Sequence, residues 1–335
     1  MVKIADVARH ASVSASTVSY VLSGKRPISQ ETRERVQESI RVLGYRPHAG
    51  ARSLASRRAN VIALVVPLHS GVHVPVVMQF ATSVVTTARS YDHDVLLLTQ
   101  DEGERGIQRV AETALADAVI VMDIELQDPR LPVLRSLQAP VVLIGFPSDA
   151  RGLTCVDLDF AGAGQICVQY LVDQGHRCVG LIGSPPEVYE RQTGYATRVA
   201  EGFTSAVRAA GIAGETLPCD TSRKDVFRAV EELLRDHPDL TALVIHNEPV
   251  IETVLDALRS CGRRVPEDVS VVAICPDEMA VRLDLTAVAL PAEQIAHAAV
   301  DLVMSKLDGT TAAESTIVPP TLTARGSTCP PNSSS

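Results

Sequence analysis

The chain has 335 residues, of which 46% are hydrophobic and 3% aromatic, and its formal net charge is −9. This length exceeds one ordinary domain and the composition is that of a globular protein, so a wholly disordered chain is excluded. No run approaches the roughly 18 apolar residues of a membrane span, and the N-terminus lacks the apolar stretch of a secretion signal. We therefore expect a cytoplasmic protein of two or three units with no membrane partner.

The seven cysteines are scattered along the chain, and none lies in a CxxC pair. This pattern argues against a disulfide framework and against a zinc site. His69 and His73 also lack the spacing of metal ligands, and no GxSxG, GxGxxG, P-loop or HExxH motif is present. We therefore expect no catalytic residues, no metal, no cofactor and no enzymatic activity.

Charge is distributed unevenly between the first 60 residues and the rest of the chain. Residues 1–60 hold eleven Lys and Arg against four acids, a net +7, whereas the remainder carries −16. A basic head on an acidic body indicates that only the head meets a polyanion such as DNA.

The head is predicted to form three short helices. Residues 3–10 carry apolar side chains at helical spacing. A second helix begins after Ser14, a favourable N-cap, and ends at the helix-stopping sequence SGKRP at 23–27. A third helix is capped by Ser29 and closed by Gly44. The side chains predicted to be buried in the second and third helices are Val18, Val21, Leu22, Val36, Ile40 and Leu43.

Two short helices joined by a tight turn and supported by a third form a helix-turn-helix, whose second helix enters the major groove. Ala15 and Tyr20 face solvent on that helix. Its hydroxyl side chains are short enough to approach the DNA backbone closely, and they belong to Ser14, Ser16, Thr17 and Ser19. A small helical cap with a solvated polar face is the alternative interpretation.

From residue 60 onwards, short β-branched runs alternate with helical stretches, which predicts parallel sheets covered by helices on both faces. Two such sets of runs, in about 270 residues, predict two doubly wound subdomains with a ligand cleft beyond the carboxyl ends of their strands. The runs are Val61–Val66, Val95–Leu98, Ala118–Met122, Val141–Ile144, Val179–Ile182, Ala242–Ile245 and Val269–Ile274.

The motif IADVAxxAxVSxSTVSxVLSG, followed by ETRERV and LGYRP, closely resembles the N-terminus of the lactose/galactose-repressor family of bacterial regulators. The resemblance continues through QGHR at 174–177, EGF at 201–203 and RVPEDVSVV at 264–272. It implies a helix-turn-helix head, a minor-groove hinge helix and a body like a periplasmic sugar-binding protein. The implied partners are double-stranded operator DNA, a small-molecule effector and a second copy of the chain, with a tetramer as a further possibility.

The resemblance assigns Ala15, Ser16 and Tyr20 to the base-reading face, and most relatives carry Arg at the position of Tyr20. Arg binds guanine through two hydrogen bonds, whereas Tyr offers one hydroxyl and a flat ring. We therefore expect an operator that departs from the family consensus at that base pair. Packing of Tyr20 on the sugar-phosphate backbone is the alternative.

Residues 47–59, PHAGARSLASRRA, have the composition of a simple linker. By resemblance they are a hinge that folds into a helix on DNA, with Leu54 wedged between base steps and Arg52 on the backbone. His48 replaces the usual Asn and Gly50 replaces a bulkier residue. Because Gly disfavours a helix, this hinge should be harder to order than that of most relatives.

The effector-binding residues of the family transfer only in part. Val199 and Cys275 stand where relatives commonly carry Arg and Asp, and Gly145 stands in place of a polar residue. The candidates are Asn247, which matches, Arg198 and Asp277, which are displaced, and Phe160 and Tyr189, which could stack on a sugar. For each of these except Asn247, a structural role is the alternative.

Together these observations predict a helix-turn-helix domain at 1–46, a hinge at 47–59 and an effector-binding and dimerisation body at 60–335. The chain is expected to cross between the two subdomains of the body near 160, 290 and 318. The favoured function is a DNA-binding transcriptional repressor controlled by a small polar effector, of which a sugar is one class. An activator of the same family and a solute-binding protein without DNA function are the alternatives, and the basic head argues against the second.

Overall fold

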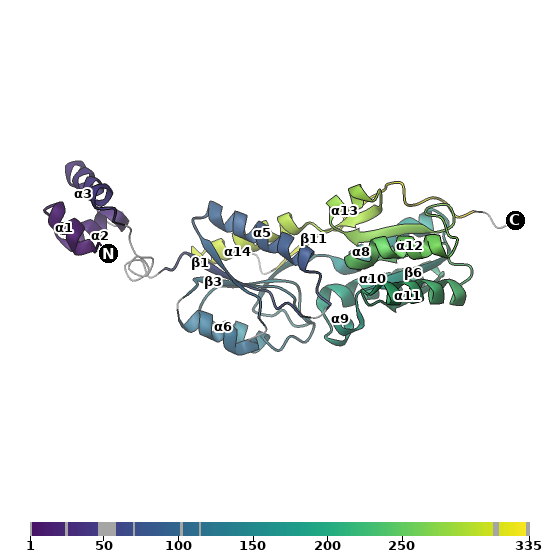
Figure 1. Cartoon of the computed structure of the whole chain (residues 1–335). Coiled ribbons are helices and arrows are strands. Elements are labelled where there is room, and N and C mark those ends of the chain that lie inside the picture. Colours follow the sequence, from purple (N-terminus) through teal and green to yellow (C-terminus); the bar gives the residue numbers. More distant parts are fainter. Residues whose placement is uncertain are drawn as a thin grey trace.

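The computed structural model describes residues 2–23, 26–45, 58–69, 71–100, 103–113, 115–310 and 315–332. Within these ranges the chain forms a three-helix head and a body of two α/β subdomains (Figure 1). The predicted architecture, a helix-turn-helix head with two doubly wound parallel sheets, is confirmed. None of the described helices is both long enough and apolar enough to cross a membrane.

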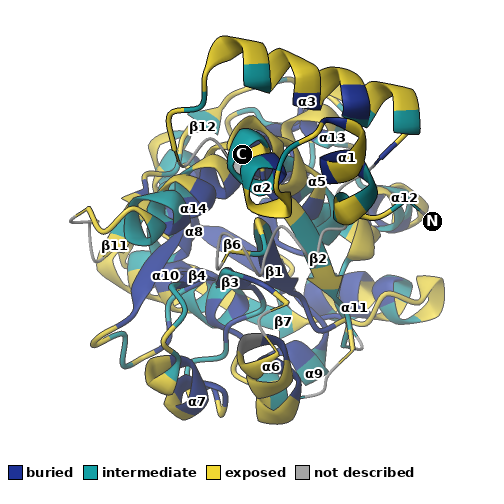
Figure 2. Ribbon diagram, turned by 90° about the vertical axis from the view of Figure 1, so that its left-hand side faces the viewer, coloured by how far each residue is buried: buried dark blue, intermediate teal, exposed yellow. Residues whose placement is uncertain are grey.

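The head has a hydrophobic core of its own. Its helices are α1 (Ile4–His10), α2 (Ala15–Ser23) and α3 (Gln30–Leu43). Val7, Val18 and Val36, one from each helix, are fully buried together. Figure 2 shows α3 exposed along most of its length, because only its inner stripe meets the other two helices.

Both predicted caps of α3 are present. Ser29 accepts a hydrogen bond from the Thr32 N–H, and Gly44 ends the helix in the left-handed region with φ 61°. The prediction that Leu22 is buried is wrong, since this residue is 41% exposed. Val21 is the last residue of α2 that packs against the core, so the end of the helix extends beyond the buried region.

The first subdomain contains a six-stranded sheet in which all neighbours are parallel. In spatial order its strands are β11 (Ser315–Val318), β5 (Thr154–Leu158), β4 (Val141–Ile144), β3 (Ala118–Val121), β1 (Val61–Val65) and β2 (Asp94–Leu98). One face is covered by α5 (Val74–Ser90) and α14 (Ala292–Leu307), the other by α6 (Gly103–Glu112) and α7 (Leu131–Ser136). The central strands β3 and β4 are buried at every position, as expected between two layers of helices.

The second subdomain repeats this plan, with β12 antiparallel to β10 and all other pairs parallel. Its strands in order are β12 (Leu322–Thr323), β10 (Thr286–Ala289), β9 (Ser270–Cys275), β8 (Ala242–Ile245), β6 (Cys178–Gly183) and β7 (Ala213–Pro218). Its faces are covered by α8 (Phe160–Asp173) and α10 (Gly194–Ala210), and by α11 (Arg223–Asp236) and α12 (Ile251–Ser260). Short helices follow three strands at their carboxyl ends, namely α9 (Pro186–Glu190), η1 (Glu248–Val250) and α13 (Asp277–Arg282).

Each predicted strand agrees with the observed one to within one residue at each end. The series of apolar runs omitted β5, β7, β10, β11 and β12. The edge strand β7, with the sequence AGETLP, is exposed at four of its six positions and so needs no apolar run. The chain passes from one sheet to the other after β5, after β10 and after β11.

Helices α8 and α10 pack with almost no space between their backbones. A Cβ at Gly164 would lie 2.5 Å from the Val199 carbonyl oxygen, and one at Gly202 would clash with the Ala161 carbonyl. The two glycines therefore permit a contact that any larger residue would block. This contact positions the cavity described below, because α8 begins at Phe160 and α10 begins at Gly194.

Gly202→Ala should destabilise the protein, although Ala favours a helix by about 1 kcal/mol over Gly. The added methyl would press α10 away from α8, and we expect the free energy of unfolding to fall by about 1–3 kcal/mol. Chemical denaturation measures this change. Thr204→Ala, at an exposed position of the same helix, is the control and should differ from wild type by less than about 0.5 kcal/mol. Unchanged or higher stability in Gly202→Ala would contradict the close packing.

Candidate functional site

The exposed face of α2 forms the candidate DNA-reading surface. Ser14 caps the helix, since its Oγ accepts a hydrogen bond from the Thr17 N–H at 3.0 Å. Val18 holds the helix in the head core, which leaves Ala15 and Ser16 exposed near the helix start. Residues at the start of a recognition helix contact base edges, so the base-reading role of Ala15 and Ser16 stays a prediction.

Tyr20 and Arg26 form a pair at the far end of this surface. The guanidinium of Arg26 lies 5.1 Å from the centre of the Tyr20 ring, within the range of a cation–π contact. Tyr20 is half-buried and Arg26 is exposed. A positive charge therefore lies beside the ring of Tyr20. The hinge candidates Arg52 and Leu54 lie outside the described residues.

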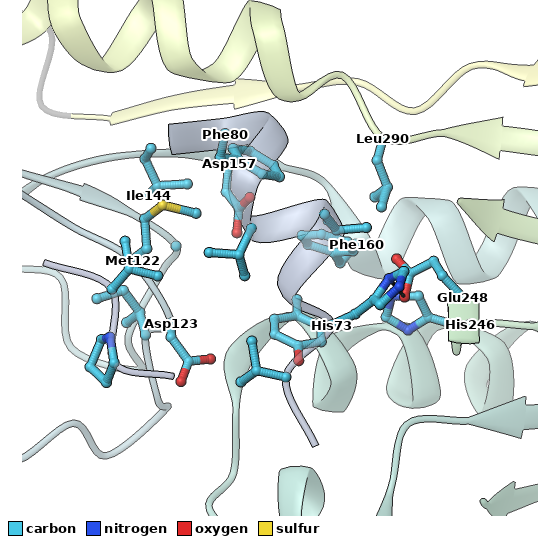
Figure 3. A pocket seen from close by; sticks show the side chains of 18 residues that line it. His73, Phe80, Met122, Asp123, Ile144, Asp157, Phe160, His246, Glu248 and Leu290 are labelled. Carbon is cyan, nitrogen blue, oxygen red and sulfur yellow. Dashed lines mark ion pairs between the residues drawn. The ribbon is translucent and has the colours of Figure 1, made fainter. Parts of the chain in front are cut away.

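A cavity of about 820 Å³, including the part that is open to solvent, lies between the two subdomains. Twelve of its eighteen lining residues are apolar or glycine, and six carry polar side chains. The polar residues are His73, Asp123, Asp157, Tyr195, His246 and Glu248. Figure 3 shows Asp123 and Asp157 on one side of the space and His246 with Glu248 on the other. The cavity is therefore a largely apolar site with a few placed polar groups, as expected of a small-molecule site.

Burial changes the ionisation of the polar groups in the cavity. It raises the pKa of Asp157 to about 7 and that of Glu248 to about 7. It lowers the pKa of His246 to about 4 and also lowers the pKa of His73. Both imidazoles are therefore neutral at neutral pH, and the two carboxyl groups titrate in the physiological range.

Asp123 follows β3 in a left-handed backbone conformation, with φ 54°. Such a conformation costs free energy in a residue other than glycine, and it is common at functional sites. The Asp123 carboxylate lies 3.9 Å from the Arg191 guanidinium and 3.8 Å from the His69 ring. Burial nevertheless raises the pKa of Asp123 above its usual value, against the influence of Arg191.

An aromatic cluster forms the wall of the cavity on the side of the second subdomain. The rings of Phe160, Tyr195 and His246 lie 5.8–5.9 Å apart, centre to centre. Phe160 is the predicted effector residue that lines the cavity. Its position at the first turn of α8, held against α10, explains this placement.

The structure does not bring the other four predicted effector residues into the cavity lining. Asn247 is buried, and its side-chain amide donates to the carbonyls of Gly183 and Cys219 at 2.9 and 2.8 Å. Its role as an effector contact stays a prediction. Asp277 is exposed on α13 and accepts a hydrogen bond from Arg325 at 2.6 Å. Arg198 and Tyr189 lie beside Gly194 and Gly183 respectively.

Two regions of the chain match family models. The model "Bacterial regulatory proteins, lacI family" matches residues 3–48, and "Periplasmic binding protein-like domain" matches residues 168–328. The transcriptional regulator CelR of Thermobifida fusca is 30% identical over 327 residues, or 91% of this chain and 92% of CelR. Catabolite control protein A of Priestia megaterium is 27% identical over 309 residues, or 90% and 91% of the two chains. The chain belongs to the lacI family of bacterial regulatory proteins.

Solved structures share the fold of this chain. The lac repressor dimer bound to operator and the anti-inducer ONPF aligns with a TM-score of 0.82, 20% identity and coverage of 98% and 99% of the two chains. The complex of the regulator CelR with cellobiose aligns with a TM-score of 0.68, 26% identity and coverage of 98% and 100%. This chain is a DNA-binding transcriptional regulator, and its named relatives are regulators rather than enzymes.

Sequence reasoning missed most of the polar cavity residues of this regulator. Asp123 and His246 each come one or two residues after a buried strand, at the edge where parallel sheets bind ligands. That signal was available, but it points equally to Asn247. The turn after β8 buries the Asn247 side chain in backbone hydrogen bonds and leaves its neighbours, His246 and Glu248, facing the cavity.

Asp157→Asn should stabilise this regulator at alkaline pH. In the unfolded chain the carboxyl titrates near its ordinary pKa of 3.8, and in the folded chain near 7. The free energy of unfolding of the wild type therefore falls as the pH rises from about 4 to about 7. The neutral amide removes this fall, which amounts to at most about 4 kcal/mol. We expect the variant to melt above the wild type at about pH 8 and close to it near pH 4.

Asp149→Asn is the control, because folding lowers the pKa of Asp149 whereas it raises that of Asp157. Hydrogen bonds from Arg151 hold the pKa of Asp149 at about 2, so this carboxylate stabilises the folded state above pH 3.8. Its removal should lower the melting temperature at neutral pH or leave it unchanged. Thermal melts followed by circular dichroism measure both variants. If the melting temperature of Asp157→Asn depends on pH as that of the wild type does, Asp157 is not a buried carboxyl with a raised pKa.

Proposed function

We propose that this regulator is a cytoplasmic repressor that binds operator DNA as a homodimer, and that a small molecule in the cavity between its subdomains changes its operator affinity. The observation that carries the proposal is the presence, in one chain, of a helix-turn-helix head and a largely apolar cavity between two subdomains. We assign DNA binding to residues 1–46, coupling to 47–59, and effector binding and dimerisation to 60–335.

The coupling step is supported by how the end of the hinge meets the body. The Asp117 carboxylate accepts hydrogen bonds from the Ala59 and Asn60 N–H groups at 2.8 and 2.6 Å. Arg58 donates to the Leu307 carbonyl at the end of α14 at 2.8 Å. The segment that enters the hinge is therefore fixed to the first subdomain, so movement of that subdomain displaces the hinge. In this proposal Leu54 wedges between base steps and Arg52 contacts the DNA backbone.

Operator binding should depend on the head and fall steeply with salt. Each phosphate neutralised by the basic head contributes about −0.9 to the slope of log affinity against log salt. Gel shifts with an operator selected from a randomised library measure this for the full chain and for a chain of residues 60–335. The shorter chain should lose operator binding. Full operator affinity without residues 1–59 would refute the assignment of DNA binding to the head.

Tyr20→Arg should shift operator preference towards guanine at one symmetric base pair. The guanidinium offers two donors to guanine O6 and N7, worth about 1–3 kcal/mol of discrimination. The measurement is selection from a library randomised at the operator half-sites. Tyr20→Phe is the matched control, because it keeps the ring beneath Arg26 and removes only the hydroxyl. An unchanged preference in Tyr20→Arg would place this residue on the DNA backbone.

A further inference from the structure

The cavity between the subdomains presents hydrogen-bond acceptors and few donors. Three carboxyl groups line it, Asp123 and Asp157 from the first subdomain and Glu248 from the second. None of the described residues that line it is Lys, Arg, Asn, Gln, Ser or Thr. When these carboxyl groups are ionised, the side-chain donors that remain are the Tyr195 hydroxyl and the N–H groups of two neutral imidazoles. A ligand that matches this set must itself supply donors.

Two of the three carboxyl groups have no close protein cation. Asp157 accepts a hydrogen bond from its neighbour Leu158 at 2.9 Å, and no ion pair reaches it within the part of the chain that the structure describes. Arg198 attracts it only from outside the cavity lining. Glu248, whose side chain is 12% exposed, has the His73 ring 4.0 Å away as its ion-pair partner. Because that imidazole is neutral at neutral pH, it does not compensate the charge.

Asp123 differs, since Arg191 and His69 lie near it. The charge available for a ligand is therefore that of Asp157 and Glu248, which face the cavity from opposite subdomains (Figure 3). Buried acids without a cation are costly, and a bound cation would relieve that cost.

His246 provides a second, independent indication of a ligand. It is only 3% exposed, it lines the cavity, and its Nδ1 has no hydrogen-bond partner among the described residues. An unpaired polar atom in a buried position destabilises the protein unless a ligand or water satisfies it. The same ring lies against Phe160 and Tyr195, so the unsatisfied atom sits beside an aromatic wall.

We propose that this cavity binds an organic ammonium ion with an apolar body, with the charge held by Glu248 and Asp157 and the body packed against the wall around Phe160. Aromatic faces attract cations, and they do so most strongly where water is excluded. The remaining lining, which includes Val76, Val77 and Leu290, suits an alkyl or aryl group of a few carbon atoms. The inference rests on the proposed function in one respect, that this cavity is the effector site.

The test uses the full-length chain and isothermal titration calorimetry. The ammonium ligands are butylammonium, cyclohexylammonium and benzylammonium, and the neutral comparisons are benzyl alcohol and cellobiose. At least one ammonium ion should bind, and benzyl alcohol should bind more than about tenfold more weakly than benzylammonium. Glu248→Gln and Asp157→Asn should each lower the affinity for the ammonium ion by more than about tenfold. Glu252→Gln, an exposed carboxyl on α12, is the matched control and should leave the affinity unchanged.

Two results would overturn the ligand class. In the first, cellobiose or benzyl alcohol binds as tightly as the tightest ammonium ion. In the second, Glu248→Gln binds the ammonium ion with the affinity of the wild type. Absence of binding by all three ammonium ions also counts against it. Operator gel shifts with the same ligands separate this inference from the proposed function. If an ammonium ion binds without changing operator affinity, the ligand class stands and the effector role of the cavity fails. If cellobiose alone changes operator affinity, the regulator has a small-molecule effector but the ammonium class fails.

Discussion

Two backbone hydrogen bonds between the subdomains hold the body in the shape on which its cavity depends. The Leu126 N–H donates to the Gln192 carbonyl, and the Gly194 N–H donates to the Ile124 carbonyl, both at 2.9 Å. Because the groups belong to the main chain, they fix the spacing of the two halves whatever side chains surround them. Ile124, which accepts one of these bonds, is next to Asp123 in the chain, so this contact between the subdomains also positions an acid of the cavity.

The sequence predicted seven strands of the two sheets but missed most of the polar residues of the cavity. Strands such as β3 and β4 are buried on both faces, so each must be a short continuous apolar run, and such runs are visible without a structure. Cavity residues follow a different rule. Whether His246 or Asn247 faces the ligand depends on the few backbone angles after β8, where Asn247 has φ −165° and the chain turns into η1. Single-residue differences of this kind are set by tertiary hydrogen bonds, which leave no pattern in composition or spacing.

The head illustrates the same division between pattern and context. Capping by Ser29 and the left-handed Gly44 are local effects, and the residues alone predict them. The exposure of Leu22 and the pairing of Tyr20 with Arg26 depend on where a small core ends and which side chains come together beyond it. A Tyr at this position is therefore not without a nearby positive charge. A guanidinium remains within about one side-chain length of that position, attached to a different part of the chain.

Two adjacent strands of the first subdomain connect residues 59 and 60, where the proposed hinge ends, to the cavity. Strands β1 and β3 are parallel neighbours, with Ile62 opposite Ala118. Both strands begin near Asp117, whose carboxylate binds the backbone of Ala59 and Asn60 just before β1. Both end near the cavity, where Pro67 and Asp123 line its wall. A strand of five residues spans about 17 Å, so the two sites lie at opposite ends of one rigid layer. Because packed interiors deform little, a ligand that shifted the cavity end of these strands would also move the backbone of Ala59 and Asn60, where the proposed hinge ends.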